Sequence, residues 1–317
     1  MTPSAALESP VFLFYLATAA GVLVVAGLAI AGLRWGLGRN VEHAWQSYRS
    51  WLIMVPVTAA VLLLGRESAI AFFITVGALG FREFARATGL CDDQYMAGGV
   101  YLGILAAGVA ALVPDPARGV PGRYDLFMTL PVFAVAGLLA IPIVRNRARG
   151  QLQALALATL GFFLFGWMFG HLAFLTNSKY AYSYLLYVIF AVELNDVAAY
   201  TAGKLFGRHP LRSNISPKKT WEGSLGALAF SLALQWALWF TFPHFGPRDL
   251  LAVGLIVGVG GQLGDLAVSV IKRDLGVKDM GATIPGHGGI LDRIDSLIYA
   301  APLFFHYVRY RHDLNPP

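Results

Sequence analysis

The sequence predicts an all-α protein, a polytopic transmembrane helical bundle with about ten spans. Two observations favour this class. Of 317 residues, 57% are hydrophobic and only 13% are charged, whereas soluble domains carry about 25% charged residues. Apolar runs also recur at close to the roughly 20 residues that a helix needs to cross a bilayer.

The apolar runs define the expected spans in chain order. The first, Val11–Leu33, has no Lys or Arg before it and no cleavage site after a short core, so we expect an uncleaved span. Between Trp51 and Phe81 only Arg66 and Glu67 interrupt the apolar sequence. This predicts two short spans joined by a tight hairpin, with a tilted re-entrant pair as the alternative. The other runs lie near residues 98–113, 124–144, 152–175, 181–202, 223–242, 250–270 and 290–308.

Three regions follow from where the polar residues lie. Residues 1–48 form an extra N-terminal span and a cytoplasmic loop. Residues 49–175 form an N-terminal membrane scaffold, because their ionisable groups lie almost only in loops; Arg82 and Glu83, at a span end, are interpreted as interfacial anchors. Residues 176–317 form a C-terminal catalytic membrane region, since polar groups enter the spans only after residue 190.

The distribution of basic residues predicts the orientation. The loops at 34–50, 82–97, 145–151, 203–222 and 271–293 hold 17 of the 24 Lys and Arg residues. Cytoplasmic loops are enriched in Lys and Arg, so we expect these loops in the cytoplasm of a bacterial inner membrane and the N-terminus outside. The net charge of +6 suits an anionic lipid surface but is too small to indicate nucleic-acid binding. The single Cys91 excludes an intramolecular disulfide.

The first polar cluster interrupts the run at 191–210. Asn195 and Asp196 stand in an apolar helix, and Asp196, Tyr200 and Lys204 share a face because they are four residues apart. A carboxylate inside a span is a functional hypothesis by default. The alternative is an Asp–Lys pair that neutralises itself and holds the helix end in place.

The second cluster is SNISPKKTWEG, residues 213–223. Thr220 is a candidate cap for a helix that begins near Trp221. Lys218 and Lys219 beside a helix N-terminus would form a phosphate site, combining ammonium charge with free backbone N–H groups. Taken alone, an ordinary basic loop explains this segment better.

The third cluster lies between two late spans. Asp265, Ser269 and Lys272 line one helical face. A glycine-rich turn then enters a helix whose first turns carry Asp292 and Asp295, three residues apart. Such a turn lets backbone N–H groups approach an anion, and ionised carboxylates suit Mg²⁺. Interfacial salt bridges between Arg293 and these two aspartates would be the alternative, but they do not explain the glycines.

This third cluster resembles the signature of the phosphatidate cytidylyltransferases (CDP-diacylglycerol synthases). A match of this length in one register is highly specific, and the resemblance covers roughly residues 50–308. One departure is Ala267-Val268, where many members carry an acidic residue. The segments Ser216–Gly223 and Asp196–Arg208 also resemble the family. The matching signature residues are Ser269, Lys272, Arg273, Lys278, Asp279, Pro285, His287, Gly288, Gly289, Asp292, Arg293 and Asp295.

The resemblance implies transfer of CMP from CTP to phosphatidic acid at the bilayer, with Mg²⁺ and an optional second cation. A homodimer is left open. The residues implied in catalysis are Asp265, Ser269, Lys272, Arg273, His287, Asp292 and Arg293. Those implied in substrate binding are Asn195, Asp196, Tyr200, Lys204, Ser216, Lys218, Lys219, Lys278, Gly288 and Gly289. The implied metal ligands are Asp265, Asp292 and Asp295, with Asp196 as a further candidate.

Three other functions remain open at this point. A CTP-dependent lipid kinase of the polyprenol or phytol type and an ether-lipid cytidylyltransferase would use the same nucleotide. They differ in the acceptor or in the phosphate transferred. A polytopic transporter would also carry carboxylates and broken helices, but it would not need a glycine-histidine turn at the membrane boundary.

Overall fold

The structure is a computed structural model that describes residues 1–36, 38, 40–281, 283 and 288–312. It is almost entirely helical, with one two-stranded antiparallel hairpin. The helices are α1 (Pro3–Glu8), α2 (Pro10–Ala31), α3 (Glu42–Leu64), α4 (Arg66–Ala87), α5 (Gln94–Leu112), α6 (Tyr124–Val144), α7 (Gln151–Gly161), α8 (Gly170–Leu175), α9 (Ala181–Phe206), α10 (Trp221–Ala237), α11 (Pro247–Leu255), α12 (Gly261–Asp274) and α13 (Leu291–His312), and the strands are β1 (Pro210–Arg212) and β2 (Ser216–Thr220).

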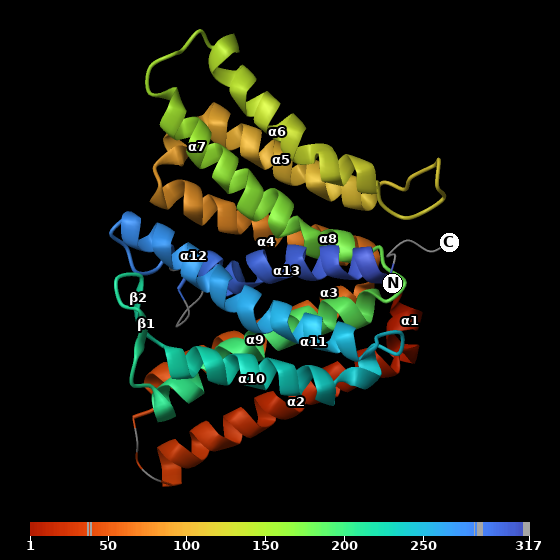
Figure 1. The fold of residues 1–317 in the computed structure, drawn as a ribbon, viewed down its shortest axis with the longest axis vertical. Helices are drawn as coiled ribbons and strands as arrows, with labels where there is room; N and C mark the ends of the chain where they lie inside the picture. The colour runs from red at the N-terminus through yellow and green to blue at the C-terminus, as the bar shows by residue number, and fades with distance from the viewer. Residues whose placement is uncertain (37, 39, 282, 284–287, 313–317) are drawn as a thin grey trace.

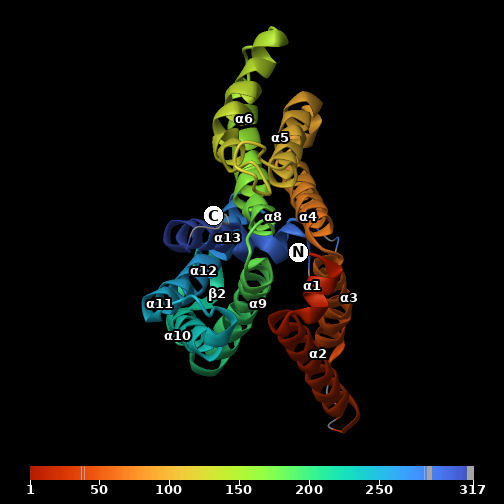
Figure 2. The same ribbon diagram turned by 90° about the vertical axis from the view of Figure 1, so that its right-hand side faces the viewer.

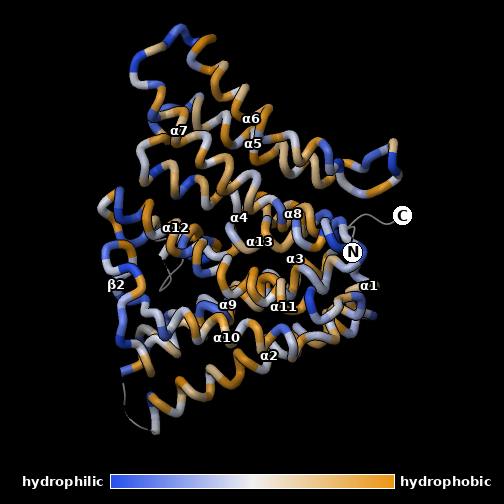
Figure 3. The backbone as a smooth tube through the Cα atoms, in the orientation of Figure 1, coloured by the Kyte–Doolittle hydropathy of each residue, from blue (hydrophilic) through white to orange (hydrophobic). Residues whose placement is uncertain are grey.

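The long helices lie side by side with their ends at two opposite edges of the molecule (Figure 1). Apolar residues predominate along the helices, and hydrophilic residues gather toward the helix ends and connecting loops (Figure 3). Eight helical segments of the described chain are long and apolar enough to cross a membrane. The remaining two expected runs, at 223–242 and 290–308, correspond to α10 and α13. The predicted all-α polytopic class is confirmed.

The hairpin expected at Arg66 is confirmed, but its arms are longer than the short spans expected. Helix α3 has 23 residues and α4 has 22, which gives each about 34 Å. Gly65 joins them with φ of +114°, a conformation that favours glycine. Arg66 then donates hydrogen bonds to Asn177 Oδ1 and to the carbonyls of Ala111 and Leu112. The hairpin is thereby tied to the end of α5.

The N-terminal helices α2 and α3 form a pair at the side of the molecule (Figure 2). Gly27 of α2 lies against the ring of Tyr48 in α3, which allows close packing. Outward residues of α2 such as Val25 and Leu28 are about two-thirds exposed, at 67% and 68%. Such an apolar outer surface suits a helix that faces lipid.

The connections that carry most of the basic residues share one edge of the molecule. In Figure 1 the described parts of the α2–α3, α4–α5, α6–α7, α9–α10 and α12–α13 connections lie toward the left-hand edge. The N-terminus and the α5–α6 loop lie at the right-hand edge. We call the left-hand edge the basic edge. The chain therefore separates its charge between two faces, as the count of Lys and Arg predicts.

Candidate functional site

Helices α9, α12 and α13 meet near the basic edge through small residues. A Cβ added at Gly264 of α12 would collide with the carbonyl of Asp295 in α13. A Cβ at Gly261, one turn earlier, would lie 3.4 Å from Asn195 Nδ2 of α9. Glycine at these positions allows the backbones to approach closely. The crossing brings polar residues of three separate helices together.

Four aspartates gather around this crossing, and we call Asp196, Asp265, Asp292 and Asp295 the acidic cluster. Lys272 is 8% exposed; its Nζ lies 2.9 Å from Asp292 Oδ1 and 3.9 Å from Asp295 Oδ2. Buried charges of opposite sign stabilise one another when each would otherwise be unpaired. Lys272 also interacts electrostatically with Asp265, so Asp265 and Asp292, predicted from separate helices, share one charged site.

Hydroxyl groups complete the contacts of the acidic cluster. Ser269 Oγ donates to Asp265 Oδ1 at 3.2 Å, as their shared helical face predicts. Ser296 Oγ donates to Asp196 Oδ2 at 3.0 Å and so links α13 to α9. The neighbouring Asn195 accepts a hydrogen bond from Ser231 Oγ, while its Nδ2 is buried with no partner within the described part of the chain.

The β1–β2 hairpin delivers a second lysine to the acidic cluster. Thr220 Oγ1 accepts a hydrogen bond from Gly223 N, so the predicted cap of α10 is confirmed. Lys219, the residue before it, places Nζ 2.6 Å from Asp265 Oδ2. Arg273 Nε donates to the Ile215 carbonyl and holds the hairpin against α12. Lys218 is exposed and Ser216 half-buried on the same strand.

The glycine-rich turn is anchored from two sides. Asp292 Oδ2 accepts hydrogen bonds from Gly289 N at 2.9 Å and Met280 N at 3.1 Å. Gly288 has φ of +79°, which favours glycine. From α4, Glu83 accepts a hydrogen bond from Leu291 N at 2.9 Å. Pro285 and His287 lie outside the described residues.

The interpretation of Glu83 as an interfacial anchor is wrong. Glu83 is only 6% exposed, and its carboxylate also accepts a hydrogen bond from Thr283 Oγ1. Gly281 and Gly289 pack so closely on its carboxylate that a Cβ at either would collide with it. The sequence held one indication that Glu83 differs from the arginines. Arg82 and Arg86 are four residues apart and share a helical face, whereas Glu83 lies on another face.

Several predicted residues form no ion pair with the acidic cluster among the described contacts. Tyr200 is 70% exposed, and Lys204 Nζ lies 5.8 Å from the centre of its ring. Among the described contacts Asp196 pairs with Ser296 rather than with Lys204, so the alternative Asp196–Lys204 pair is not found there. Lys278 is exposed. Arg293 forms no salt bridge with Asp292 or Asp295 among the described contacts, and its Nε is buried without a hydrogen-bond partner there. Lys272 takes the place of Arg293 in those pairs.

The donor atoms of the cluster fit a cation that arrives together with phosphate. Among the residues that the structure describes, no three Asp, Glu, His or Cys side chains are grouped closely enough to hold one metal ion. Mg²⁺ usually takes only one or two protein carboxylates and fills its other positions with phosphate oxygens and water. The carboxylates here, three of them paired with lysines, are enough to supply that number.

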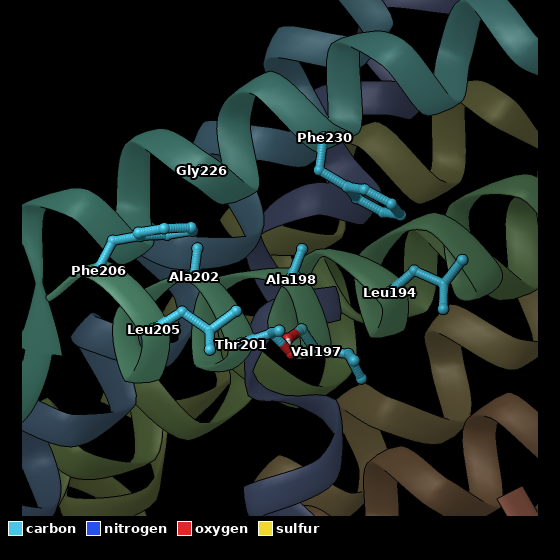
Figure 4. Close-up of a pocket in the computed structure, with 9 residues that line it drawn as sticks. All are labelled: Leu194, Val197, Ala198, Thr201, Ala202, Leu205, Phe206, Gly226 and Phe230. Carbon is cyan, nitrogen blue, oxygen red and sulfur yellow. Dashed lines mark hydrogen bonds between the residues drawn. The ribbon is translucent and has the colours of Figure 1, made fainter.

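An apolar groove lies between α9 and α10, away from the acidic cluster (Figure 4). Its volume is about 360 Å³. The α9 residues that line this groove lie on the side of the helix opposite to Asp196, as the helical spacing of about 3.6 residues per turn requires. Its lining is suited to hydrocarbon rather than to a nucleotide. The lining residues are Leu194, Val197, Ala198, Thr201, Ala202, Leu205, Phe206, Gly226 and Phe230.

Comparison with known proteins finds several relatives of this chain. Protein YnbB of Escherichia coli (strain K12), named as uncharacterised, is 29% identical over 93% of this chain and 97% of its own length. A phosphatidate cytidylyltransferase of Staphylococcus aureus (strain COL) is 42% identical over 50% of this chain and 60% of its own length. The chloroplastic phosphatidate cytidylyltransferase 5 of Arabidopsis thaliana is 32% identical over 82% of this chain and 66% of its own length.

The sequence model of the cytidylyltransferase family matches residues 45–311. This range contains α4 to α12 and nearly all of α13. It therefore includes the acidic cluster, the β1–β2 hairpin, and the two lysines of the site, Lys219 and Lys272. The family resemblance predicted from the sequence is confirmed: the chain belongs to the cytidylyltransferase family and is a nucleotide-transferring enzyme.

Proposed function

We propose that this enzyme transfers CMP from CTP to phosphatidic acid, releasing pyrophosphate and CDP-diacylglycerol. The observation that carries the proposal is the acidic cluster with Lys219 and Lys272 among its carboxylates. Such a mixture of fixed negative and positive groups suits a triphosphate with its cation. The names of the relatives from Staphylococcus aureus and Arabidopsis thaliana support phosphatidic acid as the acceptor.

The reaction requires positioning more than covalent chemistry. An oxygen of the lipid phosphate attacks the α-phosphorus of CTP and forms the new phosphorus–oxygen bond. The bond from that phosphorus to the oxygen bridging the β-phosphate breaks, and pyrophosphate leaves with the electron pair. A phosphate monoester is already largely ionised near pH 7, so no protein base or nucleophile is needed. Holding both phosphates in line supplies most of the acceleration.

The residues divide between the two substrates by their charge. Lys219 and Lys272 would bind phosphate oxygens after releasing their carboxylate partners. Gly288 and Gly289 would offer backbone N–H groups at the start of α13. Asp265 and Asp292 would hold Mg²⁺, with Asp295 and Asp196 available to a second cation. When bound, Mg²⁺ would neutralise phosphate charge as it develops.

We place the reaction at the cytoplasmic face of a bacterial inner membrane. Asp292 and Asp295 lie in the first turns of α13, directly after the α12–α13 connection at the basic edge, where the loops hold most of the Lys and Arg residues. Positive loops face the cytoplasm in most membrane proteins, and CTP is supplied there. The lipid phosphate would enter at the same level from the surrounding leaflet.

The direct test supplies purified protein with CTP, Mg²⁺ and phosphatidic acid. We expect pyrophosphate and CDP-diacylglycerol in equal amounts, with loss of both when a chelator removes the cation. Formation of CDP with a polyprenol or phytol acceptor would replace this proposal with a lipid kinase. Turnover of an ether lipid in preference to phosphatidic acid would change the acceptor, and no turnover with any acceptor would contradict the proposal.

Substitution tests the acidic cluster itself. We expect Asp265→Asn and Asp292→Asn each to reduce turnover at least about a hundredfold, the usual effect of removing a charge-stabilising group. Asp274→Asn is the matched control, because this carboxylate is exposed at the end of α12. Turnover retained in both cluster variants would contradict the assignment of these residues.

A further inference from the structure

A second pocket, lined by none of the acidic-cluster residues, lies between the end of α4 and the start of α5. Its volume is about 260 Å³. Arg82, Arg86, Gln94 and Tyr101 supply its polar groups, and small residues of both helices line the rest. The chain's single cysteine, Cys91, also lines it. Nothing in the proposed reaction uses these residues.

The two arginines of this pocket have no acidic partner. Arg82 and Arg86 stand one helical turn apart on α4, where like charges repel one another. Within the described residues neither forms an ion pair, whereas Arg145 nearby places its guanidinium 2.8 Å from Asp93. Glu83, which stands between them in the sequence, accepts hydrogen bonds from Leu291 N and Thr283 Oγ1 instead, and Asp92 contacts the Cys91 thiol. An anion between the two guanidinium groups would remove the repulsion.

The polar groups of the pocket match a phosphate. Guanidinium groups bind phosphate oxygens through two parallel hydrogen bonds. The Tyr101 hydroxyl and the Gln94 amide add further donors. Ala85, Ala97 and Gly98 give the rest of the lining a small apolar surface, which leaves room for the glycerol and first methylenes of a lipid.

The position of the pocket near the end of a membrane-spanning helix favours a lipid over a dissolved anion as its ligand. Arg82 and Arg86 belong to the last two turns of α4, a helix long and apolar enough to span the membrane. Glu83, on the same turn, contacts Leu291 at the start of α13, so the pocket lies at the basic edge. Phospholipid phosphates lie at this level of a bilayer. We propose that the pocket binds the phosphate of an anionic phospholipid, at a site separate from the acidic cluster.

Cys91 allows a test that does not depend on turnover. The protein is placed in nanodiscs of phosphatidylcholine alone or with added phosphatidylglycerol, and an uncharged maleimide measures the labelling rate of Cys91. We expect the anionic lipid to slow labelling several-fold. The double variant Arg82→Gln/Arg86→Gln should lose this protection and react at the same rate in both nanodiscs. Arg147→Gln/Arg149→Gln removes equal charge from exposed loop positions and should keep the protection.

Three results would overturn the proposal. Labelling that is equally fast in both nanodiscs would show that no anionic lipid occupies the pocket. Loss of protection in the control variant would indicate general attraction to the charged surface. Protection by inorganic phosphate in phosphatidylcholine nanodiscs, equal to that by phosphatidylglycerol, would assign the pocket to a dissolved anion. If the double variant does not fold, Arg86→Gln alone serves the same comparison.

Discussion

Two buried charged side chains near the acidic cluster have definite partners. Lys272 lies between Asp292 and Asp295, and Glu83 accepts a hydrogen bond from the backbone of Leu291. A buried charge without a partner is strongly destabilising, whereas a paired one costs far less. These contacts connect α4, α12 and α13 at single atoms. Individual residues therefore decide how the glycine-rich turn is placed.

Removing the Glu83 carboxylate should loosen that turn. We expect Glu83→Ala to lower the free energy of unfolding by about 1–3 kcal/mol, because Leu291 N–H would lose its acceptor in a buried position. Turnover should fall as well, since Gly289 packs on the same carboxylate. Thermal unfolding and product formation measure the two effects. Glu67→Ala, at the exposed opposite end of α4, is the control; equal effects from both variants would contradict this role.

Asp93 carries a pH-dependent contribution to stability. Burial raises the pKa of Asp93, but its hydrogen bonds and ion pair with Arg145, together with the N–H groups of Tyr95 and Met96, outweigh this and bring the pKa below its ordinary value. A carboxyl whose pKa is lowered by folding stabilises the protein above its unfolded pKa. That stabilisation is lost as the pH falls through the folded pKa.

The variant Asp93→Asn isolates this charge, because asparagine is also a good helix N-cap. We expect it to lower the melting temperature at neutral pH, by an amount corresponding to about 1 kcal/mol. The difference from the unsubstituted protein should shrink as the pH falls and Asp93 becomes protonated. A difference that stays constant into the acid range would show that the charge is not its cause.

Helix packing determines where the aspartates meet. Asp196, Asp265 and Asp295 lie on three helices, and none of these helices holds the cluster alone. Gly261 and Gly264 permit the close crossing of α12 with its neighbours. A π-helical segment, Ile256–Gly260, directly precedes α12; such segments are frequent at functional sites. The spacing between these helices is therefore a condition for the chemistry.

A single methyl group at the crossing should disturb it. We expect Gly264→Ala to destabilise the protein by about 1–3 kcal/mol, the usual cost of overpacking, and to reduce turnover by moving Asp265 relative to Asp295. Gly137→Ala is the matched control, since a Cβ at that helical glycine meets nothing within 4 Å. It should be neutral or stabilising by up to about 1 kcal/mol. Unchanged turnover in Gly264→Ala would show that the crossing tolerates separation.

At the scale of the whole molecule, the separation of charge between two edges sets the expected orientation. The basic loops lie toward one edge and the N-terminus lies at the other (Figure 1). In this orientation we expect the start of α13, with Asp292 and Asp295, and the Arg82–Arg86 pocket at the end of α4 to lie near one membrane face. Nucleotide and lipid phosphate would then approach at the same level of the bilayer.

Labelling of cysteines in membrane vesicles tests this orientation. We expect a membrane-impermeant maleimide to reach Cys91 in inside-out vesicles and to leave it unlabelled in right-side-out vesicles. In a Cys91→Ser background, Ala117→Cys places a thiol in the exposed α5–α6 loop at the opposite edge. Its labelling should show the reverse pattern. The opposite outcome for both thiols would invert the topology and move the proposed site away from the cytoplasm.

Contacts within one helix were easier to predict than contacts between helices. Ser269 meets Asp265 because four residues separate them on one helix, and Thr220 caps α10 through local geometry. The same spacing brings Lys204 over the Tyr200 ring, but Asp196 accepts a hydrogen bond from Ser296 of α13 and forms no ion pair with Lys204 among the described contacts. Arg273 binds a backbone carbonyl of the hairpin, and Lys272 rather than Arg293 pairs with the aspartates. These choices depend on neighbours far apart in the chain.

The amino-acid sequence by itself determined the helical class, the extent of the apolar runs, the charged edge and the family. Hydrophobic length and the positions of Lys and Arg are local properties, and the bilayer imposes the same requirements on any such chain. Only the tertiary structure decided that Glu83 supports the glycine-rich turn and that Lys219 and Lys272 reach the acidic cluster. Asp265 lies 46 residues from Lys219, Leu291 lies 208 residues from Glu83, and Asp292 faces Lys272 from the next helix. The periodicity of residues within one helix carries no information about which helices will be in contact.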